Sequence, residues 1–256
     1  MPFIKIDHVK KVYQGTVNCE ALKEVSFNMD KGEFISIMEP SGSGKTTLLN
    51  LVSTIDTPTR GTILIDGQNP QQLKKSELAI FRRRNLGFVF QDFHLLETLT
   101  IGENIVIPLV LEGVNITEIE QKLAFTSKRL GIDKILDKRI HEVSGGQKQR
   151  AAIARAMIHS PKVLLADEPT GSLDSKASKD VMETIEQLNR EDETSIMMVT
   201  HDPVAASYCS RVLFIKDGEI YNELVRGERR SVFYQSILDV LSFLGGETID
   251  VSQARF

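Results

Sequence analysis

The sequence predicts an α/β fold built on a parallel sheet. Short apolar runs that suit buried strands alternate with helix-like segments, and this alternation is typical of parallel strands joined by helical crossovers. The clearest runs are Phe34–Met38, Lys162–Ala166 and Ser195–Val199. Between the first two runs, residues 91–157 have helical periodicity and few strand signals. This change predicts a helical insertion within the α/β core.

The other elements follow from local patterns in chain order. Alternating apolar and polar residues predict strands at Phe3–Ile6, Val25–Met29 and Thr62–Ile65, and a terminal hairpin over residues 212–220. Helical patterns are present over residues 47–52 and 175–189 and in the tail. The tail pattern consists of Val232, Phe233, Ile237, Leu238, Leu241 and Leu244, followed by Gly245-Gly246, which would end the helix.

Composition excludes several classes of protein. The 256 residues are 41% hydrophobic and 26% charged, as in ordinary globular proteins, and can bury a sizeable core. A formal net charge of -4 gives no support to non-specific nucleic-acid binding. With only Cys19 and Cys209, a disulfide scaffold is excluded and reduced thiols are expected. No run approaches the roughly 18 apolar residues of a membrane helix, and no signal peptide is expected, so another chain would have to supply any membrane span.

The strongest local motif is EPSGSGKTT, from Glu39 to Thr47, between a predicted strand and a predicted helix. This is the context of a phosphate-binding loop, in which backbone N–H groups at a helix N-terminus point at the anion. Lys45 would reach the β- and γ-phosphates, and the Thr46 hydroxyl would ligate Mg²⁺. The candidate phosphate-binding residues are Ser41, Gly42, Ser43, Gly44, Lys45, Thr46 and Thr47.

Glu39 departs from the strict phosphate-loop pattern, which has glycine there. A carboxylate near a triphosphate repels it, unless the side chain points away to solvent or to a basic neighbour. A glycine position can also require positive φ, which Glu tolerates poorly. Nucleotide affinity is therefore the property that Glu39 puts in question.

Two further motifs carry chemistry. The run VLLADEP ends a predicted strand in Asp167, placed to bind Mg²⁺ through water, and Glu168, placed to polarise the attacking water. Alone, this could be an ordinary surface acidic pair. The run VSGGQKQR precedes a helix predicted at Lys148–Met157 and offers N–H donors at a helix N-terminus. Alone, it could be a plain helix cap with Ser144 as N-cap.

In this order the three motifs resemble the ATP-binding cassette family, whose LSGGQ signature has Val143 here in place of Leu. The resemblance implies a P-loop NTPase (RecA-like) cassette with an N-terminal antiparallel β part and a helical subdomain. It implies ATP hydrolysis with ATP and Mg²⁺ as cofactors. It divides the chain into residues 1–90, the first part of the ATP-binding core; 91–157, the helical subdomain with the signature; 158–227, the second part of the core; and 228–256, a helical tail.

The resemblance also assigns roles to single residues. Tyr13 would stack on adenine, and Gln91 would contact Mg²⁺ and the γ-phosphate and couple to the membrane partner. His201, after a predicted strand, would sense the γ-phosphate. The implied catalytic residues are therefore Glu168, His201, Lys45 and Gln91, and the implied metal ligands are Thr46, Gln91 and Asp167. In the family two copies pair head to tail, so the signature residues Ser144, Gly145, Gly146 and Gln147, with Asp174 of the D-loop, would complete the site of the second copy.

Within this family, the chain resembles the ATP-binding subunits of the bacitracin and antimicrobial-peptide resistance (Bce-type) branch. The resemblance lies in LLNLVSTID, in the segment from His201 to Tyr221 and in the long tail. That branch implies a membrane permease as partner, a sensor histidine kinase as a further partner, and a peripheral location at the cytoplasmic face of the cell membrane. The alternatives are a lipoprotein-release, macrolide-export or cell-division ATPase, and a nucleotide-binding subunit with impaired turnover because of Glu39. Cassettes acting on DNA or ribosomes are disfavoured, because the chain has one cassette and no long coiled-coil insertion, and no nucleic-acid partner is expected.

Two surface features remain open. The tail helix is expected to pack on the core of its own chain; contact with a partner or a second cassette is the alternative, and membrane-surface binding is disfavoured because its polar face lacks a basic stripe. The basic run Arg82-Arg83-Arg84 is expected to be a solvated helix face, with contact near the permease as the alternative.

Overall fold

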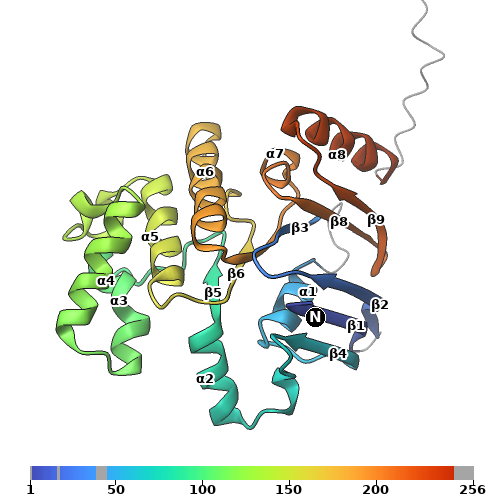
Figure 1. The fold of residues 1–256 in the computed structure, drawn as a ribbon, viewed down its shortest axis with the longest axis horizontal. Helices are drawn as coiled ribbons and strands as arrows, with labels where there is room; N and C mark the ends of the chain where they lie inside the picture. Colours follow the sequence, from blue (N-terminus) through green and yellow to red (C-terminus); the bar gives the residue numbers. More distant parts are fainter. Residues whose placement is uncertain (1, 16–17, 39–44, 245–256) are drawn as a thin grey trace, which may run out of the picture.

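Two β-sheets, a lobe of helices and a C-terminal helix make up the chain (Figure 1). The computed structural model describes residues 2–15, 18–38 and 45–244. The expected helix end at Gly245-Gly246 lies outside these ranges. In the described ranges no helix is long and apolar enough to cross a membrane.

The larger sheet has six strands in the order β5-β6-β7-β3-β8-β9. They are β3 (Phe34–Met38), β5 (Leu86–Val89), β6 (Val163–Asp167), β7 (Ser195–Val199), β8 (Arg211–Lys216) and β9 (Glu219–Val225). The first five in sheet order pair in parallel and β9 pairs antiparallel with β8. The predicted parallel sheet and terminal hairpin are therefore confirmed. β5 was not expected, because its four residues follow a helix directly and give too short a pattern.

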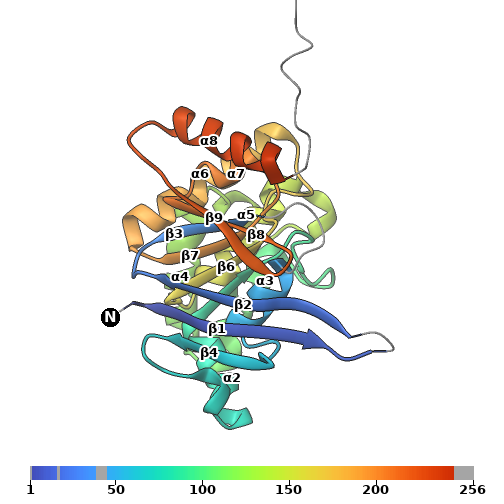
Figure 2. The same ribbon diagram turned by 90° about the vertical axis from the view of Figure 1, so that its right-hand side faces the viewer.

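The smaller sheet is antiparallel, with the order β2-β1-β4. Its strands are β1 (Ile4–Tyr13), β2 (Cys19–Met29) and β4 (Arg60–Ile65). β1 and β2 run further than the predicted strands because the ladder continues past an irregularity at His8, which has a φ of 49°. Gly61 of β4 lies beside this irregularity and has a φ of +85°. A Cβ on Gly61 would lie 2.3 Å from the His8 carbonyl oxygen. Figure 2 shows this sheet beneath the six-stranded one.

The helical insertion predicted for residues 91–157 is confirmed by α3 (Ile101–Glu112), α4 (Ile116–Arg129) and α5 (Gly145–Met157), with the short 3-10 turns η2 (Asp133–Ile135) and η3 (Ile140–Glu142). α5 begins three residues earlier than expected. Its N-cap is Ser144, whose hydroxyl accepts from the Gln147 backbone while the Gln147 side chain accepts from the Ser144 backbone. This reciprocal capping extends the helix through the two glycines.

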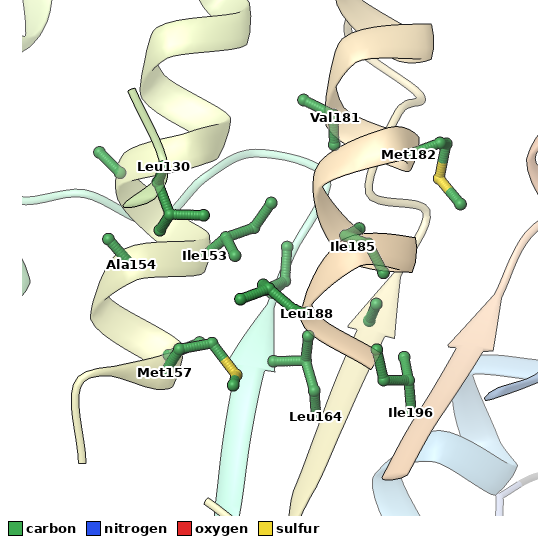
Figure 3. Close-up of a cluster of buried hydrophobic side chains, with 14 of the residues drawn as sticks. Leu130, Ile153, Ala154, Met157, Leu164, Val181, Met182, Ile185, Leu188 and Ile196 are labelled. Carbon is green, nitrogen blue, oxygen red and sulfur yellow. The ribbon is translucent and has the colours of Figure 1, made fainter. Parts of the chain in front are cut away.

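The remaining helices flank the sheets. They are α1 (Lys45–Val52), η1 (Pro70–Gln72), α2 (Lys75–Asn85), α6 (Ser175–Asp192), α7 (Pro203–Ala206) and α8 (Arg230–Leu244). Figure 3 shows apolar side chains of α5 and α6, such as Ile153 and Ile185, meeting Leu164 of β6 and Ile196 of β7. This cluster joins the helical lobe to the sheet as packed layers around one hydrophobic core.

The basic run on α2 is less solvated than expected. Arg82 is half-buried and donates through Nε to Thr54 Oγ1 at 2.6 Å, and Arg83 donates to the Leu111 carbonyl at 2.8 Å. Arg84 is exposed and pairs with Glu112 at 3.0 Å. Because successive residues point in different directions around a helix, these arginines tie α2 both to the end of α1 and to the end of α3.

The tail helix α8 packs on its own chain, as expected. Phe233, Ile237, Val240 and Leu244 form a buried stripe with Met38 of β3 and with Val212 and Phe214 of β8. Val232, which the sequence pattern assigned to the apolar face, is 54% exposed. The stripe repeats every three or four residues, and Val232 falls beside it.

We expect Phe233→Ala to lower the free energy of unfolding by about 3 kcal/mol, because it removes a buried aromatic ring from this cluster. Phe243 on the same helix is 72% exposed and is the matched control. Phe243→Ala should change stability by about 0.5 kcal/mol or less. Denaturant unfolding measures both, and equal losses would contradict the packing of α8.

Candidate functional site

The acidic motif and the histidine meet at the carboxyl edge of the parallel sheet. Asp167 is the last residue of β6 and pairs with Val199 of β7. Glu168 follows at a φ of 46°, and its backbone N–H donates to the Val199 carbonyl at 2.9 Å. His201 lies two residues beyond the end of β7. Parallel strands end at the same edge, so the pairing brings Glu168 beside His201.

The Glu168 carboxylate is held by three donors. His201 Nδ1 lies 2.8 Å from Oε1, and the Thr200 hydroxyl and the His201 backbone N–H donate to Oε2 at 3.1 and 3.3 Å. A carboxylate only accepts, so Nδ1 carries the ring proton and Nε2 is the ring atom that can face a substrate. The Glu168 side chain is 15% exposed and that of His201 is 68% exposed. The pair thus combines a screened carboxylate with an accessible imidazole.

Tyr13 lies near the N-terminal part of α1, held by two charged residues. Its hydroxyl donates to Asp56 Oδ2 at 3.0 Å, and Lys11 Nζ lies 4.8 Å from its ring centroid. Lys11 also donates to Asp56 Oδ1 at 2.6 Å and to the Thr57 carbonyl at 2.9 Å. Sequence reasoning missed Lys11 and Asp56 as supports of Tyr13, although Asp56 ends the LLNLVSTID segment. The ring is 40% exposed, so a planar base could stack on it.

The charge network lowers the pKa of Asp56. Partial burial acts to raise that pKa, but hydrogen bonds from Lys11, from the Thr57 backbone and from Tyr13, together with the charge of Lys11, outweigh it. The carboxylate form is therefore the one that the folded chain stabilises.

The predicted phosphate loop falls largely outside the described residues. Glu39, Ser41, Gly42, Ser43 and Gly44 are not described, so what was expected of them stays a prediction. Lys45 is the first residue of α1, followed by an exposed Thr46 and a half-buried Thr47. The last described residue before this helix is Met38, the carboxyl end of β3, which is the neighbour of β7.

The signature packs against the D-loop. A Cβ on Gly145 would lie 3.1 Å from Leu173 Cδ2, and a Cβ on Gly146 would lie 3.1 Å from Ala177 Cβ. Asp174 caps α6 by accepting from the backbone N–H groups of Lys176 and Ala177. The absence of a side chain at Gly146 therefore favours the close approach of α5 to α6, and its absence at Gly145 favours the contact of α5 with Leu173.

The predicted site residues fall into two groups. Figure 1 shows α5, with the signature at its start, in the helical lobe, and α1 on the other side of β5 and β6. The first group lies in the two sheets, just after the ends of β6 and β7, and in α1; it consists of Tyr13, Lys45, Thr46, Thr47, Asp167, Glu168 and His201. The second group lies at the starts of α5 and α6 and consists of Ser144, Gly145, Gly146, Gln147 and Asp174. Gln91 lies beside the loop between β6 and α6, since its carbonyl accepts from the Ser172 hydroxyl at 2.9 Å.

The donor set suits Mg²⁺. Thr46, Gln91 and Asp167 offer a hydroxyl, an amide and a carboxylate, all of them oxygen donors of the kind that Mg²⁺ prefers. Among the described residues no group of three or more His, Cys, Asp or Glu side chains could hold a metal ion. A site with one carboxylate is the usual arrangement for Mg²⁺ that is also bound by substrate phosphates.

Comparison with known proteins identifies the family. A family model described as ABC transporter matches residues 22–171. The chain belongs to the ABC transporter family. Among its relatives, the ABC transporter ATP-binding protein YxdL of Bacillus subtilis (strain 168) is 61% identical, with 98% of each chain covered. The bacitracin export ATP-binding protein BceA of Halalkalibacterium halodurans is 49% identical over 96% of this chain and 98% of its own.

A solved structure shares the fold. The ATP-binding cassette MJ0796, described in a dimeric post-hydrolysis state bound to ADP and Pi, superposes with a TM-score of 0.80 at 39% identity, covering 88% of this chain and 99% of that one. The predicted cassette fold is therefore confirmed. The chain is the ATP-binding subunit of an ABC transporter and an ATPase, with Mg²⁺ as the cofactor of that reaction.

We expect Asp56→Asn to lower the free energy of unfolding by about 1 kcal/mol at neutral pH, because it removes a charged acceptor. The folded-state pKa of Asp56 lies below its unfolded value. The wild-type advantage is therefore fully present above the unfolded pKa and is lost as the pH falls through the folded pKa. Denaturant unfolding across this range measures it.

The control for that prediction is Asp66→Asn, which breaks the exposed pair with Lys162 at 2.6 Å. Surface pairs contribute little, so this change should cost about 0.5 kcal/mol or less. If the loss of unfolding free energy in Asp56→Asn stays the same as the pH is lowered, the stabilising role of the Asp56 carboxylate is contradicted.

Proposed function

We propose that this subunit powers a membrane permease that confers resistance to bacitracin-like or cationic antimicrobial peptides. The observation that supports its catalytic role best is the Glu168–His201 pair, 2.8 Å apart at the carboxyl edge of the sheet. In this proposal Glu168 accepts a proton from the water that attacks the γ-phosphorus of ATP, and ADP leaves. His201 orients the carboxylate through Nδ1 and contacts the γ-phosphate through Nε2.

The other residues bind the nucleotide. Tyr13 stacks on adenine, Lys45 neutralises the β- and γ-phosphates, and Gln91 contacts the γ-phosphate. Ser41, Gly42, Ser43, Gly44 and Thr47 complete the phosphate loop. Thr46, Gln91 and Asp167 hold Mg²⁺, which neutralises charge on the phosphate oxygens when bound.

We further propose that two copies of the chain pair head to tail. Figure 1 shows α5, which begins with the signature, and α1 on opposite sides of β5 and β6, and this separation supports the arrangement. Ser144, Gly145, Gly146 and Gln147 of one copy then close the site of the other, with Asp174 at the border. A relative that is 40% identical is described as dimeric, which also supports the proposal.

The peptide-resistance branch is supported by sequence identity. The chain is 49% identical to the bacitracin export relative over 96% of its residues. It is 45% identical to the macrolide export ATP-binding/permease protein MacB of Campylobacter jejuni over a smaller share, 79% of its residues. In this proposal the partners of the subunit are a permease and a sensor histidine kinase, at the cytoplasmic face of the membrane.

We expect Glu168→Gln to reduce kcat for ATP at least about a hundredfold while ATP still binds. The glutamine amide has the size of the glutamate side chain but cannot act as the general base. In size-exclusion chromatography with ATP the variant should run as a dimer. Adding Ser144→Arg should return it to a monomer that still binds ATP. Fast hydrolysis by Glu168→Gln would remove the base assignment, and a persistent dimer would remove the head-to-tail arrangement.

In cells, deleting the gene for this subunit should increase sensitivity to bacitracin, and the Glu168→Gln variant should fail to restore resistance. Growth inhibition by a macrolide, measured in parallel, separates the two transporter classes. Unchanged bacitracin sensitivity with increased macrolide sensitivity would favour the macrolide-export alternative.

A further inference from the structure

The backbone directly after Gln91 adopts an unusual conformation. Phe93 and His94 have φ values of 59° and 46°, so two successive residues with side chains are left-handed. Such a pair is usually built from Asn and Gly, because a Cβ crowds the backbone in this region. A bulky aromatic residue there is unfavourable by itself, so the surrounding structure must hold the turn in place.

Arg155 of α5 binds the backbone of this turn. It is half-buried, and its two terminal nitrogens donate to consecutive carbonyls, Nη2 to Phe93 at 2.9 Å and Nη1 to His94. The planar fork of a guanidinium suits two acceptors at once, which a lysine ammonium matches less well. The His94 ring adds a contact to the Phe90 ring, with the centroids 4.5 Å apart.

The segment before Gln91 is held from the same helix. The Gln149 side chain, fully buried, donates through Nε2 to the Phe90 carbonyl at 3.2 Å and to the Pro169 carbonyl at 2.6 Å. Pro169 directly follows Glu168. Gln91 is thus flanked on both sides by carbonyls that bind α5, and α5 is the helix that starts with the signature.

We propose that Arg155 is a positioning residue for ATP hydrolysis. By holding the left-handed turn at Phe93-His94, it fixes Gln91 relative to α5 and to the strand end that carries Glu168. Movement of the signature helix is then transmitted to Gln91 through two hydrogen bonds to the backbone. This inference rests on the proposed contact of Gln91 with the γ-phosphate.

The test compares Arg155→Met with the wild-type chain at full length. We expect kcat for ATP to fall about tenfold while KM stays within about twofold, because the binding residues remain and only the placement of Gln91 is relaxed. Hydrogen exchange should accelerate in the amides of residues 91–96. Arg155→Lys keeps the charge but matches the two carbonyls less well, so its kcat should lie between those of Arg155→Met and the wild type. It is also the milder variant to use if Arg155→Met folds poorly.

The matched control is Arg129→Met. Arg129 also bridges two elements through both terminal nitrogens, binding Glu191 at 2.8 Å and Asp192 at 2.5 Å, but it lies on α4 and does not contact the segment after Gln91 in these hydrogen bonds. The Arg129→Met variant should be less stable than the wild type, with no change in kcat for ATP or in amide hydrogen exchange at residues 91–96. An equal loss of kcat in both variants would overturn the inference, since it would indicate general loosening.

Relief of the strained turn provides a second test. Phe93→Gly removes the Cβ that makes the left-handed conformation costly, so in that background Arg155→Met should reduce kcat only about twofold or less. A full tenfold loss in the Phe93→Gly background would show that Arg155 does not act through the turn.

Gln91→Ala separates this inference from the proposed function. If Gln91→Ala is slow and Arg155→Met is as fast as wild type, the proposed function stands and the positioning role of Arg155 is overturned. If Gln91→Ala turns over at the wild-type rate, the proposed role of Gln91 fails and the positioning role of Arg155 fails with it. Slow turnover in both, with faster exchange at residues 91–96, supports both.

Discussion

The parallel pairing of β6 with β7 is the constraint on which the site depends. Its register sets Asp167 opposite Val199, and one residue later the Glu168 backbone still donates to the Val199 carbonyl. Only in this register does the Glu168 carboxylate reach the His201 ring and the Thr200 hydroxyl. A slip by one residue would turn the side chains of a strand to the opposite face of the sheet and separate the pair. Nearly every side chain of β6 and β7 is buried, so a slip would also disrupt the close packing on both faces of the sheet.

α5 connects the parts of the molecule that hold the candidate site. Its first turn presents the signature glycines to the D-loop, its apolar face packs toward β6 and α6, and its polar side chains reach the backbone around Gln91. A rigid helix with a contact to each part transmits displacement better than a loop does, because packed elements shift as units. The helical lobe is thus joined to the sheet by both apolar packing and directed hydrogen bonds.

Charged residues away from the sheet edge also hold elements in place. Lys11 and Asp56 orient Tyr13, and Arg82 and Arg83 join α2 to the ends of α1 and α3. Each of these groups is at least partly shielded from water, so its hydrogen bonds contribute more than those of exposed surface pairs. The α8 helix, by contrast, packs through the apolar contacts of its buried stripe, and its first residue, Arg230, lies over the Tyr208 ring.

The sequence by itself determined the α/β class, the helical insertion, the tail helix and the family, because these depend on periodicity and on motifs whose order is fixed along the chain. The structure confirmed those elements but changed the start of α5, revealed β5, and removed Val232 from the apolar stripe of α8. Tertiary structure alone decided that Lys11 and Asp56 support Tyr13 and that Gln149 and Arg155 hold the backbone beside Gln91. The hydrogen bonds that join these segments link residues 43 to 62 positions apart, and no local pattern encodes such a separation. Long-range register and packing fix them, which is why they became visible only once the strands and helices were placed together.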